Sequence, residues 1–417
     1  MKKILLLINS AFPYGRSEPW LEDEQYYYRD FDKILVVPVE KSRWEEIRTL
    51  NPKIELVNIN PPGKIKLFLA ALQCLGLQDY KDEREKLQLQ MHTDAKYKIK
   101  CIKFMAKSYY DYKEIIKYLN SHKYIDNYKI TLYSYWMKVM AYTCVLLKKS
   151  FPESKFITRC HGVDLYEYRH DLGYIPMRTA IFRNVDKIFP ISEDGKKYLV
   201  ANSHVDRNKI EVSYLGAKDN GIQTYVKEER DRGKKFSILS CSNIVDVKRI
   251  DRIIASINIL SKKYNGSIIW KHYGDGPLKN VMEEKAAVLL PDVSWEIIGS
   301  VSHPELMKKI HEDSSDVFIN TSESEGIPVS IMEALSFGIP VIAPDVGGIS
   351  EIIMNGLNGF LINEKDNIGL YAEAMQLIAD MNSQDYFILR RNARRSWEDK
   401  WNLSENYNKF AIQLSSV

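Results

Sequence analysis

Two glutamates stand eight residues apart in the segment 322–335, which follows an apolar run that we expect to be a β-strand. The carboxylates of Glu325 and Glu333 can both accept hydrogen bonds from sugar hydroxyls. A helix that begins near Pro328, a favoured first-turn residue, separates them by roughly 12 Å at about 1.5 Å per residue. That is close to the distance between the sugar ring and the ribose of a nucleotide sugar. The free N–H groups and positive dipole at the helix start favour a diphosphate between the two ends.

The segment from Glu325 to Ala334 resembles the E-x7-E signature of family 4 glycosyltransferases, which are retaining nucleotide-sugar enzymes of GT-B fold. Residues 338–343 and 346–351 resemble the sequence that normally follows this signature, and residues 274–277 match the second turn of the family's donor domain. The match runs from about 237 to 360 and is patchy in the first half. The resemblance is to the type that assembles bacterial surface and capsular polysaccharides.

The resemblance implies that Glu325 binds hydroxyls of the donor sugar, that Glu333 binds the ribose, and that Lys248 binds the diphosphate. Asn243 stands where the family usually has an arginine, which leaves one fixed cation fewer unless the neighbouring Arg249 turns inward. The expected donor-binding residues are Glu325, Gly326, Ile327, Pro328, Glu333, Lys248, Asn243, Arg249 and Gly274.

A second group of candidates follows an expected strand in the first half. The turn 160–164 resembles the family's His-Gly turn, whose histidine reaches the donor sugar, although a lone histidine is more often structural. The resemblance implies that His161, together with Glu325 and Lys248, is catalytic. Asp164 is a candidate for a contact with an acceptor or donor hydroxyl.

The loop 9–20 occupies the place of the family's glycine-rich first loop but carries a single glycine. A glycine lets the backbone approach a phosphate or an acceptor closely, so Gly15 and Arg16 are candidate contacts. The G-x-G-x-x-G pattern is absent, which disfavours a nicotinamide dehydrogenase.

To lie near one another, the candidate residues must follow strands that end at the same edge of a sheet. Short apolar runs alternate with longer amphipathic stretches, which is typical of βα units on a parallel sheet. The expected strands lie at 3–8, 33–39, 54–59, 130–133, 155–158, 187–191 and 209–213, and then at 237–240, 267–272, 294–298, 316–320 and 340–343.

This order predicts an α/β chain of GT-B fold, with two doubly wound, Rossmann-like domains that face a central cleft. We expect an acceptor-binding domain at 1–215, a linker at 216–235, a nucleotide-sugar domain at 236–395, and a helix at 396–417 that packs back on the first domain.

Charge is distributed unevenly over the 417 residues. Residues 1–215 carry 36 basic and 27 acidic residues, whereas the remainder carries 23 and 28, so an anionic partner should prefer the first half. The stretch 64–118 is basic, and its bland interpretation is a solvated helix face. Its functional interpretation, centred on 96–117, is a surface for anionic lipid or a pyrophosphate-linked acceptor. No nucleic-acid-binding pattern accompanies it.

The five cysteines lie far apart, and the apolar runs are too short for a signal peptide or a membrane-spanning helix. We therefore expect a cytoplasmic protein, at the inner membrane face if the acceptor is lipid-linked. We expect it to need no metal and no cofactor.

The expected reaction is retaining transfer of a hexose or N-acetylhexosamine from a nucleotide sugar, with UDP favoured by family frequency, to a glycan or lipid-linked glycan. The working mechanism is a front-face route in which the leaving phosphate takes the acceptor proton. Two alternatives stay open: a nucleotide-sugar epimerase or hydrolase of the same fold, and a non-catalytic sugar-binding relative.

Overall fold

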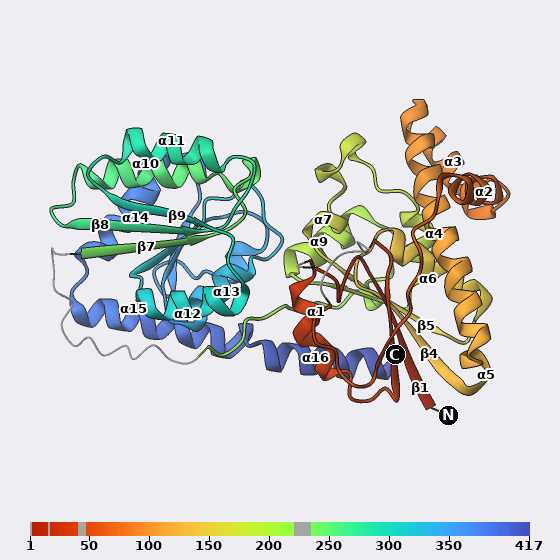
Figure 1. Ribbon diagram of the computed structural model, residues 1–417. Helices are drawn as coiled ribbons and strands as arrows, with labels where there is room; N and C mark the ends of the chain where they lie inside the picture. The colour runs from red at the N-terminus through yellow and green to blue at the C-terminus, as the bar shows by residue number, and fades with distance from the viewer. Residues whose placement is uncertain (1, 16, 41–46, 221–234) are drawn as a thin grey trace. The chain divides into compact units, whose positions relative to one another are not determined.

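The computed structural model describes residues 2–15, 17–40, 47–220 and 235–417, and the chain divides into two compact units (Figure 1). Unit 1 comprises Met1–Ser213 and Tyr407–Val417, and unit 2 comprises Tyr214–Asn406. Both units have a six-stranded parallel sheet with helices on its faces, which is the Rossmann-like arrangement expected for a GT-B chain.

The sheet of unit 1 has the strand order β3-β2-β1-β4-β5-β6. Its strands are β1 (Lys2–Asn9), β2 (Lys33–Pro38), β3 (Ile54–Leu56), β4 (Tyr128–Ser134), β5 (Lys155–Cys160) and β6 (Lys187–Pro190). In β1, Ile4, Leu6 and Ile8 join one hydrophobic cluster, while Leu5 and Leu7 join another on the opposite face. Burial on both faces explains why this strand is a continuous apolar run without alternation.

Helices cover both faces of this sheet. They are α1 (Pro19–Glu24), α2 (Lys64–Cys74), α3 (Gln78–Leu89), α4 (Ala95–Ser121), α5 (Tyr124–Asn127), α6 (Val139–Ser150), α7 (Gly162–Leu165), α8 (Arg178–Asn184), α9 (Glu193–Asn202) and most of α16 (Leu403–Ser416). Buried residues of α4 and α6 belong to the cluster of Ile4, and Phe410 and Leu414 of α16 belong to that of Leu5.

A fully buried ion pair lies on the face covered by α16. Arg159 of β5 pairs with Glu24 of α1, and neither side chain is exposed. Glu24 Oε1 also accepts hydrogen bonds from the hydroxyls of Tyr28, at 2.6 Å, and Tyr133, at 3.1 Å. The Arg159 guanidinium lies 4.0 Å from the centre of the Phe410 ring. Burial disfavours the charged guanidinium, but Glu24 and the surrounding tyrosine hydroxyls together outweigh it, so the pKa of Arg159 lies above its ordinary value.

The sheet of unit 2 has the strand order β12-β11-β10-β7-β8-β9. Its strands are β7 (Lys235–Cys241), β8 (Ser267–Tyr273), β9 (Ser294–Gly299), β10 (Val317–Ile319), β11 (Val341–Pro344) and β12 (Gly359–Ile362). Its helices are α10 (Ile250–Ser261), α11 (Lys279–Leu289), α12 (His303–Asp313), α13 (Val329–Ser336), α14 (Ile368–Asp380) and α15 (Ser383–Ser396). Figure 1 shows α10 and α11 on one face and α12, α13 and α15 on the other.

The structure differs from the sequence prediction at two strands. Residues 209–213 form no strand; Arg207–Lys209 is a 3-10 turn, and the segment contacts β6 through an isolated bridge at Ile210 and through N–H groups of Glu211 and Ser213 that donate to Ile188 O and Pro190 O at 3.0 Å. The neighbouring strand β6 ends at Pro190, which has no N–H with which to extend the ladder. The four-residue edge strand β12 was not predicted, because its short sequence follows a glycine-containing turn and lacks a clear period.

The C-terminal stretch is helical but interrupted. Between α15 and α16, Trp397–Trp401 forms a π-helical turn, and Asn402 is extended. Ala217 lies against this break, donating to Trp401 O and accepting from Leu403 N, both at 3.0 Å. Unit 2 ends at Asn406 and the chain returns to unit 1 at Tyr407, whereas the predicted boundary is at 395. Most of the predicted linker, 221–234, lies outside the described residues.

Candidate active site

Glu325 lies in the turn between β10 and α13, and its carboxylate is held by three side chains. Oε1 accepts from Lys248 Nζ and Ser322 Oγ, both at 2.6 Å, and from Asn320 Nδ2 at 3.4 Å. Lys248 comes from the turn after β7, the strand that pairs with β10. The carboxyl ends of two neighbouring parallel strands thus bring the predicted Lys248 and Glu325 into direct contact, at the edge where α/β sheets bind ligands.

The helix that carries the second glutamate starts where the sequence indicated. Pro328 is the N-cap residue and α13 begins at Val329, while Ile327 and Pro328 are buried and Gly326 is half-buried. Glu333 lies in the second half of this eight-residue helix, and its Oε1 is 2.7 Å from Nε2 of His303, the first residue of α12. The side chains of Glu325 and Glu333 are therefore both fixed by neighbours.

The backbone at Gly347 and Gly348 packs against the turn that carries Glu325. Gly348 N donates to Gly326 O at 2.9 Å, and a Cβ on Gly347 would lie 2.0 Å from Glu325 O. Gly347 also has a positive φ of 56°. Only glycine satisfies both conditions.

We expect Gly347→Ala to weaken nucleotide-sugar binding at least roughly tenfold, because the new methyl group must displace the Glu325 backbone and such sites tolerate little misplacement. Gly173→Ala is the matched control: Gly173 has a φ of 57°, and a Cβ on this residue would meet no other atom within 4 Å. The control should lose only the stability that a positive φ costs a non-glycine residue, about 1 kcal/mol. Equal donor affinity in both variants, measured by calorimetric titration, would contradict the assigned role of Gly347.

The backbone at Gly274 also passes close to that of Ser242, the residue before Asn243. Gly274, which follows β8, has a φ of 149°, and a Cβ there would lie 1.8 Å from Ser242 O. Asn243 itself is exposed after β7. The pKa of the thiol of Cys241, the last residue of β7, is raised to about 12; burial is the largest cause, the charge of Glu333 also raises it, and that of Lys248 lowers it.

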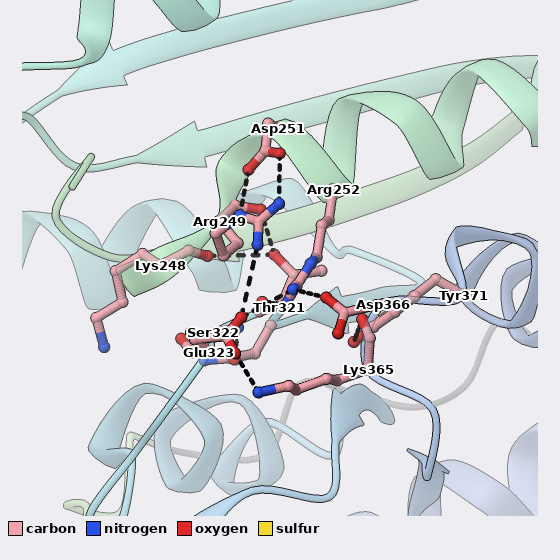
Figure 2. A network of polar contacts seen from close by, with 11 residues as sticks. Lys248, Arg249, Asp251, Arg252, Thr321, Ser322, Glu323, Lys365, Asp366 and Tyr371 are labelled. Atoms are coloured by element: carbon pink, nitrogen blue, oxygen red, sulfur yellow. Dashed lines mark hydrogen bonds and ion pairs between the residues drawn. The ribbon is translucent and has the colours of Figure 1, made fainter. Parts of the chain in front are cut away.

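Arg249 takes part in a separate network of charges. Its Nε and Nη2 donate to the two oxygens of Asp251 at 3.0 Å, and Nη1 lies 3.5 Å from Glu323 (Figure 2). Arg252 and Lys365 also contact Glu323. The Lys248 side chain points away from this network in Figure 2. Arg249, a candidate replacement for the missing cation at Asn243, is thus paired with Asp251 and Glu323.

In unit 1, His161 follows β5 and its side chain is 6% exposed. Its ring lies against three aromatic rings, with centroid distances of 4.4 Å to Trp136, 4.9 Å to Tyr135 and 6.4 Å to Trp20. Among the described residues, neither ring nitrogen has a hydrogen-bond partner. A buried imidazole without a hydrogen-bond partner is unusual, and its Nδ1 lies 3.8 Å from Asp164 Oδ1.

Asp164 is fully buried and is fixed by backbone groups. Oδ1 accepts from His161 N at 2.5 Å, and Oδ2 accepts from Met137 N at 2.6 Å. The carboxylate thereby ties the loop after β4 to the turn after β5. This arrangement favours a role in holding the His161 turn over the predicted hydroxyl contact.

The loop after β1 contains a functional feature that sequence reasoning missed. The buried carboxylate of Glu18 accepts from the backbone N–H groups of Ser10, Ala11 and Phe12, each at 2.8 Å. It also accepts from Trp136 Nε1 at 2.5 Å, so it fixes an indole that lies against the His161 ring. These N–H groups face an internal anion in place of a phosphate. The signal in the sequence is slight: a glutamate directly before Pro19, the first residue of α1.

Gly15 lies in the same loop with a φ of 59°. Arg16 lies outside the described residues, so the structure places no contact for it. Within the described ranges, no group of three or more histidine, cysteine, aspartate or glutamate residues is arranged to hold a metal ion.

Comparison with known proteins gives the chain's relationships. Residues 222–396 match the family described as Glycosyl transferases group 1. The chain is 27% identical over 273 residues to the putative colanic acid biosynthesis glycosyltransferase WcaL of Salmonella typhimurium, covering 63% of this chain and 64% of the relative. It is 25% identical to the amylovoran biosynthesis glycosyltransferase AmsK of Erwinia amylovora, covering 64% and 65%. The alignments therefore span less than two thirds of these relatives.

The fold is shared over the full chain with a solved structure. HepE of Anabaena, crystallised in complex with UDP and glucose, superposes with a TM-score of 0.66 at 15% identity and covers 100% of both chains. This likeness shows the GT-B arrangement of two Rossmann-like domains.

Proposed function

Because residues 222–396 are a glycosyl transferases group 1 domain, we propose that the protein transfers a sugar from a nucleotide-sugar donor to a glycan acceptor. The donor is a UDP-linked hexose or N-acetylhexosamine, which binds to unit 2. A UDP donor is supported by the UDP in the HepE complex, and a glycan acceptor by the polysaccharide-assembly relatives. The acceptor is a lipid-linked intermediate of cell-surface polysaccharide assembly, and the catalyst belongs to family 4.

The observation that carries this proposal is the pair of carboxylates on either side of the α13 N-terminus. Glu325 precedes the helix and contacts Lys248, and Glu333 lies within the helix and contacts His303. We assign the sugar hydroxyls to Glu325 and the ribose hydroxyls to Glu333. Lys248 binds the diphosphate, together with the N–H groups at the start of α13, which is eight residues long.

Transfer proceeds with retention by a front-face route. The acceptor oxygen bonds to the anomeric carbon on the face from which the diphosphate leaves, and the acceptor proton passes to the departing β-phosphate oxygen. Lys248 stabilises the charge that develops on that phosphate. Asp164 is not the nucleophile in this scheme, because its side chain is fully buried and its oxygens hold backbone N–H groups. His161 contacts the donor sugar, and the reaction needs no metal.

We expect UDP and a UDP-sugar to raise the melting temperature of the wild type, because a ligand that binds only the folded state stabilises it by mass action. Glu333→Ala should lose most of this shift, since the ribose loses a charged hydrogen-bond acceptor worth about 1.5–3 kcal/mol. Glu364→Ala is the control, because Glu364 is an exposed glutamate of the same unit. A panel that includes GDP-, ADP- and CMP-sugars identifies the base.

An unchanged shift in Glu333→Ala would refute the ribose assignment, and no shift with any nucleotide would favour a non-catalytic relative. Donor consumption in the absence of an acceptor distinguishes a transferase from the epimerase or hydrolase alternative. A transferase is nearly idle without an acceptor, whereas those enzymes consume the donor alone.

A further inference from the structure

Helix α2 has apolar side chains on opposite faces. Ala70 and Cys74 are buried in the core of unit 1, and Leu67 and Ala71 pack against it. Ile65, Phe68, Leu69 and Leu72 lie on the other face, because residues three and four apart share one side of a helix. A helix that is apolar all round is normally buried on all sides.

The second face of α2 is open to solvent. Ile65 is 78% exposed and Phe68 is 63% exposed, and Leu69 and Leu72 are each more than half exposed. Figure 1 shows α2 beside α4 at the border of unit 1. Exposed contiguous apolar side chains of this size mark surfaces that bind a partner. We call these four residues the α2 face.

Positive charge surrounds the α2 face. Lys64 and Lys66 flank it on the same helix, which carries no acidic residue, and both are exposed. Residues 64–107 contain ten basic and five acidic residues. Of the acids, Asp79 pairs with Lys149, Asp82 pairs with Arg183, and Glu83 is buried. Internal contacts thus occupy three of the five carboxylates.

Some lysines of the basic stretch are paired within unit 1, and others are exposed. Lys100 donates to Asp171 O and Tyr174 O, both at 2.7 Å, and Lys107 pairs with Asp111 at 2.6 Å. These two lysines of α4 are therefore committed within unit 1, whereas Lys96, Lys98 and Lys103 are exposed. The apolar residues needed for insertion lie mainly on α2, outside the predicted stretch 96–117.

We propose that the α2 face inserts into the interfacial region of an anionic lipid bilayer, with Lys64 and Lys66 at the level of the lipid headgroups. An apolar face flanked by lysines matches the two components of such a surface, acyl chains and negative charge. Among the described residues, no helix is long and apolar enough to cross a membrane. This inference does not depend on the identity of the donor or the acceptor.

Vesicle cosedimentation tests the proposal. The wild type should bind vesicles of equal parts phosphatidylglycerol and phosphatidylcholine, and bind pure phosphatidylcholine much more weakly. Phe68→Ser/Leu72→Ser should lower the partition coefficient on anionic vesicles at least roughly tenfold, because two apolar side chains leave the bilayer. Lys64→Gln/Lys66→Gln should lower it roughly fivefold per lysine.

The matched control is Ile412→Ser/Leu377→Ser, whose side chains are 62% and 51% exposed on other helices, close to the values of 63% and 51% for Phe68 and Leu72. The control should bind like the wild type. Equal binding by the Phe68 and Leu72 variant, or no binding by the wild type, overturns the proposal. A wild-type dimer that this variant dissociates in sedimentation equilibrium would overturn it in favour of a second copy. The nucleotide-sugar melting shift, measured on every variant, reports separately on the donor site.

Discussion

Replacing Lys248 by alanine is expected to lower kcat for sugar transfer by roughly 10²–10³-fold, with saturating donor. The lysine supplies a fixed charge aimed at the leaving diphosphate, and loss of one such preorganised donor costs about 2.7–4 kcal/mol of transition-state stabilisation. The dependence should be unusually strong here, because Asn243 provides no charge and Arg249 is paired with Asp251 and Glu323. Donor consumption in the presence of acceptor measures the effect.

The control for Lys248→Ala is Lys271→Ala. Lys271 contacts Asp313 at 2.6 Å in the same unit, the same separation as Lys248 and Glu325, and both lysines are partly buried. The two variants should therefore lose comparable stability, while only Lys248→Ala loses transfer. A similar loss of activity in both would show that Lys248 acts through the fold.

Glu24→Gln should lower the free energy of unfolding by about 3–5 kcal/mol, because it leaves Arg159 as a buried charge without a counter-ion. Glu24 and Arg159 are both fully buried, so water cannot compensate for the lost carboxylate. Urea denaturation followed by circular dichroism measures the change.

Glu22→Gln, two residues earlier in α1, is the matched control for Glu24→Gln. The Glu22 side chain is 50% exposed and its oxygen lies 3.6 Å from Arg48, so its loss should cost about 0–1 kcal/mol. The double variant Glu24→Leu/Arg159→Met should recover much of the stability, because it removes both charges. If Glu24→Gln unfolds at the same urea concentration as Glu22→Gln, the pair does not stabilise unit 1.

The elements of both sheets could be predicted because parallel strands buried on both faces are short apolar runs. The β1 run at 4–8 and the β10 run at 317–319 are examples. The strand predicted at 209–213 was wrong because an alternating polar and apolar segment at a sheet edge does not reveal whether its neighbour can extend the ladder. The break at Asn402 depends on the distant Ala217, and so no local period announces it.

The donor-site candidates Glu325 and Lys248 could be proposed from their motif, and the structure brings them into contact. Glu18 could not, because its role depends on backbone N–H groups six to eight residues earlier and on Trp136, which lies 118 residues later. The pairing of Arg249 with Glu323 could not be predicted either, since Glu323 comes from the turn after another strand. Motifs therefore predict a candidate site, and tertiary contacts show which residues hold its side chains.

The central claim is that one donor molecule binds with its ribose at Glu333 and its sugar at Glu325. Saturation-transfer difference NMR with UDP-glucose tests it directly, because it reports which ligand protons lie against the protein. We predict strong signals from both the ribose and the glucose ring in the wild type, and selective weakening of the ribose signals in Glu333→Ala. Absence of signals in the wild type, or selective loss of the glucose signals in Glu333→Ala, would contradict the claim.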